Sequence, residues 1–239
     1  MQVEIWSDVV CPWCYIGKRR FEKALAAFEH ADQVEVVWKA FELDPNAPFA
    51  RSRSMAEQLA AKYRRSVPQA EAMLASMDRA FAGEGLDVHL ADTTGGNTFD
   101  AHRVLHLALE VGGPQLQGQV KEALLQAYFV EHRHVADPDV LREVAVAAGL
   151  PEAEVDATLA DRDRYAEAVR AEEREAHELG STGVPFFVID RTFAVPGAQD
   201  VDTFLTVLRR SWERSHPQLV TVDPAAGACD GDSCAVPTA

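Results

Sequence analysis

The sequence has no long apolar run and a shortage of positive charge, and these two features exclude several classes of protein. No apolar stretch approaches the roughly 18 residues that a membrane-spanning helix needs, so we expect no membrane segment. The 239 residues include 23 Lys and Arg against 38 Asp and Glu, a formal net charge of −15. A field of this sign disfavours nucleic acid and anionic membrane surfaces as partners.

The first residues also lack the pattern of a secretory signal, because Met1 to Trp6 show no basic segment followed by an apolar one. We therefore expect a cytoplasmic protein. An apolar content of 47% is typical of a globular chain that buries its own core. The sequence does not indicate the oligomeric state.

Cysteine is scarce as well, and its four copies form two close pairs. Cys11 and Cys14 lie near the N-terminus, and Cys229 and Cys234 lie near the C-terminus. Four cysteines do little as a disulfide framework in a chain this long, and close pairs in a cytosolic protein indicate redox or metal chemistry. The first pair encloses a proline and a tryptophan, which are bulky and stiff for a zinc-binding loop. We predict no metal site.

The hydrophobic pattern predicts a strand, a helix and a second strand at the N-terminal end. Val3 to Trp6 form a short apolar strand, helical spacing covers residues 12–29, and residues 34–43 are nearly continuously apolar. Strand signals return at 184–189 and 192–195, and an amphipathic helix follows from about 200 to 214.

The middle of the chain shows helical signals only. Ser54 and Ser66 begin capping-box patterns, and Thr98 is a candidate cap of a helix that a Gly-Gly-Pro sequence ends. The two end pieces are each too small to bury a core alone, so we expect them to form one mixed α/β sheet structure. The predicted division is an α/β domain formed by 1–47 and 181–215, a helical insertion at 48–180 and a tail at 216–239.

The first cysteine pair lies at the junction between the first strand and the first helix. There the sulfur of Cys11 is close to the free N–H groups and the positive end of the helix dipole, which both favour its thiolate. Cys14 lies one turn further and is more shielded. This arrangement suits a nucleophilic Cys11 that forms a mixed disulfide and a Cys14 that resolves it. The alternative is a pair of incidental cysteines.

Several motifs together resemble the DsbA-type thioredoxin-fold oxidoreductases, and most closely their FrnE-like branch. They are Cys-Pro-Trp-Cys at 11–14, Lys-Ala-Phe-Glu-Leu at 39–43, Asn-Thr-Phe-Asp-Ala-His-Arg at 97–103, Ser-Thr-Gly-Val-Pro-Phe-Phe-Val at 181–188, and Val-Pro-Gly-Ala-Gln at 195–199. The resemblance covers about 1–215. It implies a thioredoxin fold, in the order β-α-β then β-β-α, with a large helical insertion.

The resemblance also implies roles for residues far from the cysteines. Pro185 is expected to be a cis proline opposite the pair, and the backbone of Val184 to bind an extended substrate as an added strand. We assign Trp13 to substrate binding as well. Asn97 and His102 are expected to line a cleft that faces the cysteines. The alternative for His102 is a helix histidine whose hydrogen bonds are satisfied and which has no role in the cleft.

The implied activity is that of a thiol–disulfide oxidoreductase or isomerase acting on protein thiols and disulfides or on small thiols. No metal or organic cofactor is expected, because a disulfide itself carries two electrons, and glutathione is a candidate co-substrate. The most oxidising members of the family have a histidine inside the cysteine loop. Trp13 in this chain therefore predicts a milder oxidant.

The second cysteine pair lies in an acidic tail. We hypothesise that Cys229 and Cys234 exchange disulfides with Cys11 and Cys14, because a linker raises the effective concentration of one pair at the other. The alternative is a local disulfide or two stray thiols without a role. The carboxylates nearby make these thiols poorer nucleophiles than Cys11.

Two other functions compete with this interpretation. Kappa-class glutathione transferases and 2-hydroxychromene-2-carboxylate isomerases are similar to the segment from Asp8 to Tyr15, with serine in place of Cys11. That likeness implies a glutathione-dependent transferase or isomerase of small aromatic compounds, although a thiol at this position favours redox chemistry. The second is a zinc-binding or chaperone-like module. His102 and His106 have the spacing of a zinc-protease helix, but its glutamate is missing.

Overall fold

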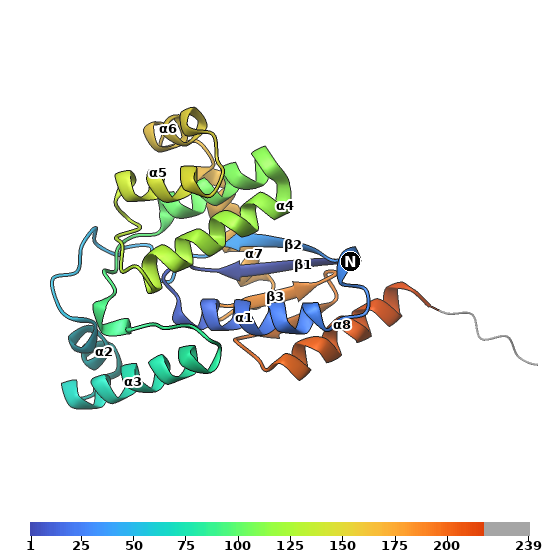
Figure 1. The fold of residues 1–239 in the computed structure, drawn as a ribbon, viewed down its shortest axis with the longest axis horizontal. Coiled ribbons are helices and arrows are strands. Elements are labelled where there is room, and N and C mark those ends of the chain that lie inside the picture. The colour runs from blue at the N-terminus through green and yellow to red at the C-terminus, as the bar shows by residue number, and fades with distance from the viewer. Residues whose placement is uncertain (218–239) are drawn as a thin grey trace, which may run out of the picture.

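The computed structural model describes residues 1–217, and its centre is a four-stranded mixed sheet (Figure 1). The strand order is β2-β1-β3-β4, with β1 and β2 parallel and the other two pairs antiparallel. This arrangement confirms the predicted thioredoxin fold, β-α-β followed by β-β-α. The strands are β1 (Gln2–Ser7), β2 (Glu35–Ala40), β3 (Phe186–Ile189) and β4 (Phe193–Pro196).

Two helices, one from each end of the described chain, lie side by side against the sheet (Figure 1). They are α1 (Pro12–Ala26), which joins β1 to β2, and α8 (Val201–Ser215), which follows β4. The ring of Phe21 lies 5.5 Å from that of Phe187 and 5.7 Å from that of Phe204. The core of the sheet is therefore built from both end pieces, as expected from their small size.

Helices fill the chain between β2 and β3. Ser54 and Ser66 each form the predicted capping box, in which the hydroxyl and the side chain three residues on satisfy free N–H groups. The boundary regions at 41–54 and 179–185 contain no helix or strand. The helices are α2 (Met55–Tyr63), α3 (Val67–Gly83), α4 (Phe99–Phe129), α5 (Pro138–Ala147), α6 (Glu152–Ala160) and α7 (Ala166–Glu178).

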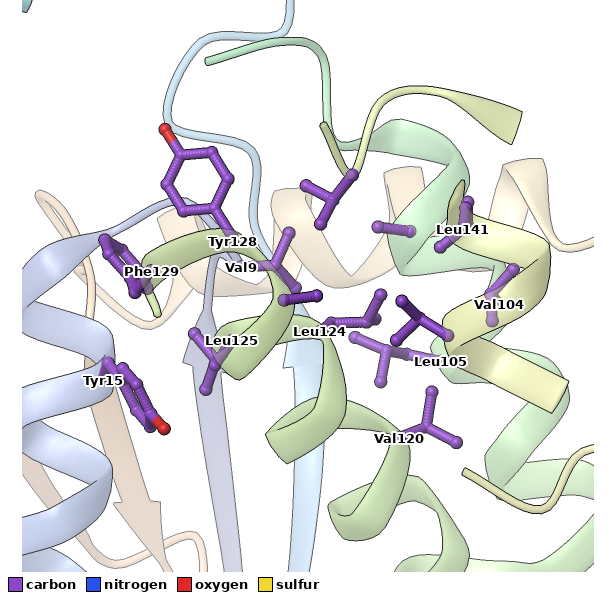
Figure 2. Close-up of a cluster of buried hydrophobic side chains, with 14 of the residues drawn as sticks. Val9, Tyr15, Val104, Leu105, Val120, Leu124, Leu125, Tyr128, Phe129 and Leu141 are labelled. Atoms are coloured by element: carbon purple, nitrogen blue, oxygen red, sulfur yellow. The ribbon is translucent and has the colours of Figure 1, made fainter. Parts of the chain in front are cut away.

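Helix α4 is broken at Gly113, where the sequence predicts a helix end. Gly113 has φ 66° and ψ −167°, a backbone conformation that suits glycine, and Pro114 then begins the second half. Both halves contribute to one hydrophobic cluster, with Val104 from the first and Leu124 from the second (Figure 2). Residues from either half therefore reach the same region beside the sheet.

Two local predictions need correction. Thr98 lies at the N-cap position of α4 but makes no capping hydrogen bond with its side chain. The side-chain oxygen of Asn97 instead accepts the N–H of Phe99 at 2.9 Å. Strand β2 is also shorter than predicted, because the N–H of Leu43 beyond its end donates to the Asp8 carboxylate at 2.7 Å and not to a strand.

Side chains from the helices close the outer edge of β2. The amide of Gln117 accepts the N–H of Trp38 at 2.9 Å and donates to its carbonyl at 2.8 Å. The carboxylate of Glu172 accepts the N–H of Ala40 at 2.6 Å. These bonds take the place of a neighbouring strand and hold the helices to the sheet.

The turn before α1 is anchored in the helical cluster. Val9 and Tyr15, on either side of the cysteine pair, are fully buried there. The ring of Tyr15 stacks on that of Phe129 with 5.8 Å between centroids (Figure 2). The position of the cysteine turn is therefore set by both parts of the molecule. No helix within residues 1–217 has the length and apolar character to cross a membrane.

Candidate active site

The cysteine pair occupies the N-terminal end of α1. Cys11 is the N-cap residue with extended φ and ψ angles, and Pro12 fills the first helical position, where a missing N–H costs nothing. Both thiols are almost fully buried, with 3% of Cys11 and 1% of Cys14 exposed. The N–H of Cys14 donates to the carbonyl of Cys11 at 3.0 Å.

The loop before β3 lies against Cys11. The thiol of Cys11 donates to the carbonyl oxygen of Val184 with a sulfur–oxygen distance of 3.6 Å, and the Val184–Pro185 peptide bond is cis. The structure thus brings together the motifs at 11–14 and 181–188, which lie 173 residues apart in the chain. The cis bond agrees with what the resemblance implies.

Gly17 allows this close approach, and the sequence analysis missed it. A β-carbon at Gly17 would lie 3.0 Å from Cγ of Pro185 and 3.3 Å from Cβ of Ala198. A glycine inside a helix costs about 1 kcal/mol relative to alanine. The close contact with the proline loop is the physical reason for glycine here.

The environment of Cys14 keeps its thiol protonated. Burial raises the pKa of Cys14 well above its usual value, and the hydrogen bond and charge of Cys11 raise it further. The positive charge of Lys121 and the backbone of Asp8 act in the opposite direction. A neutral Cys14 behind Cys11 fits the division of roles expected from the sequence.

Lys121 is a second residue that the sequence analysis missed. It comes from the second half of α4, has no exposed surface, and donates through Nζ to the carbonyl of Ser7 at 3.2 Å. Burial lowers the pKa of Lys121 to about 8. The signal in the sequence was a lysine one turn before Leu124 and Leu125, on the helix face that these leucines predict to be buried.

Asp8 and His102 form a buried polar pair near the cysteines. Each is 1% exposed, and Nε2 of His102 lies 3.4 Å from Oδ1 of Asp8. Burial alone would raise the pKa of Asp8, but His102, the N–H of Leu43 and the charge of Lys121 together hold it below its usual value. Asp8 therefore stays ionised inside the protein.

Asn97 supports the loop that follows β2. Its amide donates to the carboxylate of Glu42 at 3.0 Å and to the carbonyl of Pro45 at 3.1 Å. Of the two residues expected in the cleft, His102 contacts Asp8 and Asn97 holds the neighbouring loop. Trp13, between the cysteines, is 41% exposed.

Within residues 1–217 no group of three or more His, Cys, Asp or Glu side chains is arranged to hold a metal ion. His106, one turn after His102, lies with Nε2 3.2 Å from the Glu172 carboxylate. Cys229 and Cys234 lie outside the residues that the structure describes.

Comparison with known proteins identifies the family. The model of the DSBA-like thioredoxin domain matches residues 2–209 of this chain. The chain belongs to the DsbA-like thioredoxin domain family. This result confirms the relationship that the cysteine and proline motifs indicate.

Solved structures of DsbA-like and related proteins show the same fold. The probable DsbA oxidoreductase SCO1869 from Streptomyces coelicolor is 48% identical, with 100% of both chains covered and a TM-score of 0.84. The cytosolic disulfide reductase DsbM from Pseudomonas aeruginosa, with GSH, is 17% identical over 89% of this chain and 100% of its own, with a TM-score of 0.63. A 2-hydroxychromene-2-carboxylate isomerase is 13% identical over 90% of this chain and 98% of its own, with a TM-score of 0.65. The last two share the fold alone.

Proposed function

We propose that this DsbA-like protein is a thiol–disulfide oxidoreductase or isomerase of protein disulfides. Cys11 is the nucleophile and Cys14 the resolving thiol. The observation that carries the proposal is the contact between Cys11 and the Val184 carbonyl at the end of α1, with a protonated Cys14 buried behind it.

The proposed reaction has two steps. The Cys11 thiolate, stabilised by the helix N-terminus, attacks a substrate disulfide, forms a mixed disulfide and releases one substrate sulfur as a thiolate. Cys14 then attacks the Cys11 sulfur, so that the Cys11–Cys14 disulfide forms and the second substrate sulfur leaves. The reverse sequence oxidises a substrate dithiol.

The loop opposite the cysteines supplies the substrate site. When Cys11 enters a mixed disulfide it has no proton to donate, and the Val184 carbonyl is then free to accept an N–H from an extended substrate. Pro185 keeps its own nitrogen out of this bonding because it has no N–H. The exposed side chain of Trp13 offers an apolar contact beside the reacting sulfur.

This chemistry needs no metal or organic cofactor, because the disulfide carries the two electrons. Glutathione and other small thiols are proposed co-substrates, and protein thiols and disulfides the proposed partners. The exchange between Cys229–Cys234 and the first pair is part of the proposal, as are the support of the site by Asn97 and His102 and a cytoplasmic location.

The reduction potential tests this function. The Cys11–Cys14 couple is titrated in glutathione buffers, for the natural chain and for Cys229→Ser/Cys234→Ser. A potential above the cytosolic glutathione poise of about −220 to −260 mV means an oxidant or isomerase, and one below it means a reductase. A chain with no reversible couple would contradict the proposal. If Cys229 and Cys234 exchange disulfides with the first pair, their replacement by serine should change the reduction potential or the turnover.

The alternative is a glutathione-dependent transferase or isomerase of small aromatic compounds. The isomerase structure shares this fold with a TM-score of 0.65, so the fold does not separate the two functions. Cys11 does, because serine can hydrogen-bond a glutathione thiolate but cannot exchange a disulfide. A Cys11→Ser variant that retained full activity on such a substrate would establish the alternative.

A further inference from the structure

A lysine from the helical part of the molecule is buried against Ser7, at the end of β1 that leads into the cysteine turn. Lys121 has no exposed surface, and among the described residues the hydrogen-bond partner of its Nζ is the backbone carbonyl of Ser7 and not a carboxylate. Burying an ammonium group without a direct ion pair is costly. A role of the buried ammonium group in the reaction of Cys14 would explain why the protein keeps it despite this cost in stability.

The charges around Lys121 are those of the candidate active site. Burial lowers its pKa, while Cys14, Asp8 and Cys11 raise it and Lys18 lowers it, which leaves the pKa at about 8. In return, the charge of Lys121 lowers the pKa of Cys14. Asp8 is itself faced by His102, 3.4 Å away. The lysine and Cys14 therefore titrate as coupled groups.

Cys14 needs such help more than Cys11 does. Cys11 lies at the N-cap, at the positive end of the helix dipole, and the effect of the dipole falls off within the first turn. Cys14 is 1% exposed and its thiolate is opposed by burial and by Cys11. Within residues 1–217, the positive charge of Lys121 acts against these effects.

We propose that the ammonium group of Lys121 stabilises the thiolate of Cys14 while the mixed disulfide on Cys11 is resolved. The inference rests on the proposed oxidoreductase function and deepens it. In the step, Cys14 loses its proton, its sulfur attacks Cys11, and the Cys11–Cys14 bond forms as the Cys11–substrate bond breaks. The departing substrate sulfur takes the electron pair and the proton, so the products are an intramolecular disulfide and a free substrate thiol.

The chain offers a matched control in Lys18. Its Nζ lies 5.9 Å from the centre of the Trp38 ring and that of Lys121 lies 5.7 Å away, so both amines approach the same side chain. Lys18 is 4% exposed but forms ion pairs with Glu22 and Glu122. Replacing it removes a buried amine from the same interface and one charge that lowers the pKa of Lys121, so the ammonium group that acts on Cys14 stays in place and is favoured.

The test separates the two thiol reactions by stopped flow. Reduced full-length protein carrying Cys229→Ser/Cys234→Ser reacts with the aromatic disulfide dithiobis(nitrobenzoate). Attack by Cys11 releases one nitrothiobenzoate, and attack by Cys14 on the mixed disulfide releases the second. Both phases are followed from about pH 6 to about pH 9 in the Lys121→Met, Lys121→Gln and Lys18→Met variants.

We expect the second phase of Lys121→Met and Lys121→Gln to be slower by about tenfold or more below about pH 8, one pKa unit corresponding to tenfold. The difference should shrink above that pH, where the natural lysine loses its charge. Lys18→Met should keep the natural second phase within about twofold. Circular dichroism shows that each variant is folded, because the thiols of an unfolded chain would also react with the disulfide.

An unchanged second phase with the natural pH profile in a folded Lys121 variant would overturn the role of Lys121 and leave the proposed function intact. Cys11→Ser is followed in the same way, and a first phase that keeps its natural rate in this variant would instead overturn Cys11 as the nucleophile of the proposed function. The two failures are therefore distinguishable in one experiment.

Discussion

Gly17 of α1 lies so close to Pro185 that an added β-carbon would come within 3.0 Å of the proline ring. A helix in this position thus serves two purposes, since its first turn holds Cys11 and its second turn receives the loop that contacts Cys11. The site depends on this fit between two segments that are distant in the sequence.

Replacing Gly17 should disturb the site in proportion to the size of the new side chain. For Gly17→Val we expect a loss of about 2 kcal/mol in the free energy of unfolding, because overpacking a close contact costs about 1–3 kcal/mol. The reaction of Cys11 with a disulfide should slow as the Pro185 loop moves. Urea denaturation and the first stopped-flow phase measure the two effects.

Gly83 provides the control for this substitution. It lies at the end of α3, and a β-carbon there meets nothing within 4 Å. Gly83→Val should leave the thiol reaction unchanged. Equal effects at the two glycines would show that helix propensity, and not contact with Pro185, explains the loss.

Gln117→Leu should destabilise the protein by about 2–4 kcal/mol. The change keeps the size of the side chain but leaves the N–H and carbonyl of Trp38 without partners, and each buried unsatisfied group costs about 1–3 kcal/mol. Gln119→Leu, on the exposed side of the same helix, is the comparison. If both variants unfold at the same urea concentration, the hydrogen bonds of the Gln117 amide to Trp38 do not stabilise the packing of α4 on β2.

Lys121→Met should be more stable than the natural chain at pH 7, by up to about 3 kcal/mol. The pKa of Lys121 is about 8 in the folded chain and about 10.4 in the unfolded chain. Between these two pH values the unfolded chain therefore binds more protons than the folded chain. The stability of the natural chain therefore rises through this interval relative to the variant, and the gain from Lys121→Met shrinks. Urea denaturation at several pH values up to about 10 measures the difference in stability between the variant and the natural chain. A difference that does not change with pH would contradict a lowered pKa of Lys121.

Cys14→Ser should trap the proposed intermediate. Cys11 still attacks a substrate disulfide, but no thiol remains behind it to resolve the mixed disulfide. Mass spectrometry after brief exposure to a disulfide-bonded peptide should find the peptide attached at Cys11. Cys11→Ser is the paired control and should carry no adduct; an adduct on Cys14 in that variant would reverse the roles.

The features that the sequence predicted are those with local signals or a family motif. The caps at Ser54 and Ser66 involve residues three positions apart, and the break at Gly113 follows from the chain's own Gly-Gly-Pro. The mixed sheet formed by the two end pieces came from the hydrophobic pattern, and its assignment as a thioredoxin fold and the cis bond at Pro185 came from the resemblance. Each of these features is indicated by a few neighbouring residues or by a sequence motif.

The residues that sequence reasoning missed act over long separations. Gln117 bonds Trp38 across 79 positions and Lys121 bonds Ser7 across 114. Neither glutamine nor lysine has a helical propensity that indicates such a partner. The partners of Gln117 and Lys121 depend on the direction that the second half of α4 takes after the break at Gly113. Only the folded chain shows this direction.

The order of the strands has a consequence for synthesis of the protein. β1 is made first, yet its neighbour β3 comes from the other end, and the N–H of Gln2 bonds the side chain of Asp190, 188 residues later. At a translation rate of about 5–20 residues per second, β3 leaves the ribosome on the order of ten seconds or more after β1. The nascent chain therefore exposes an apolar strand edge while the helices form, and it is in this interval that a chaperone would meet it.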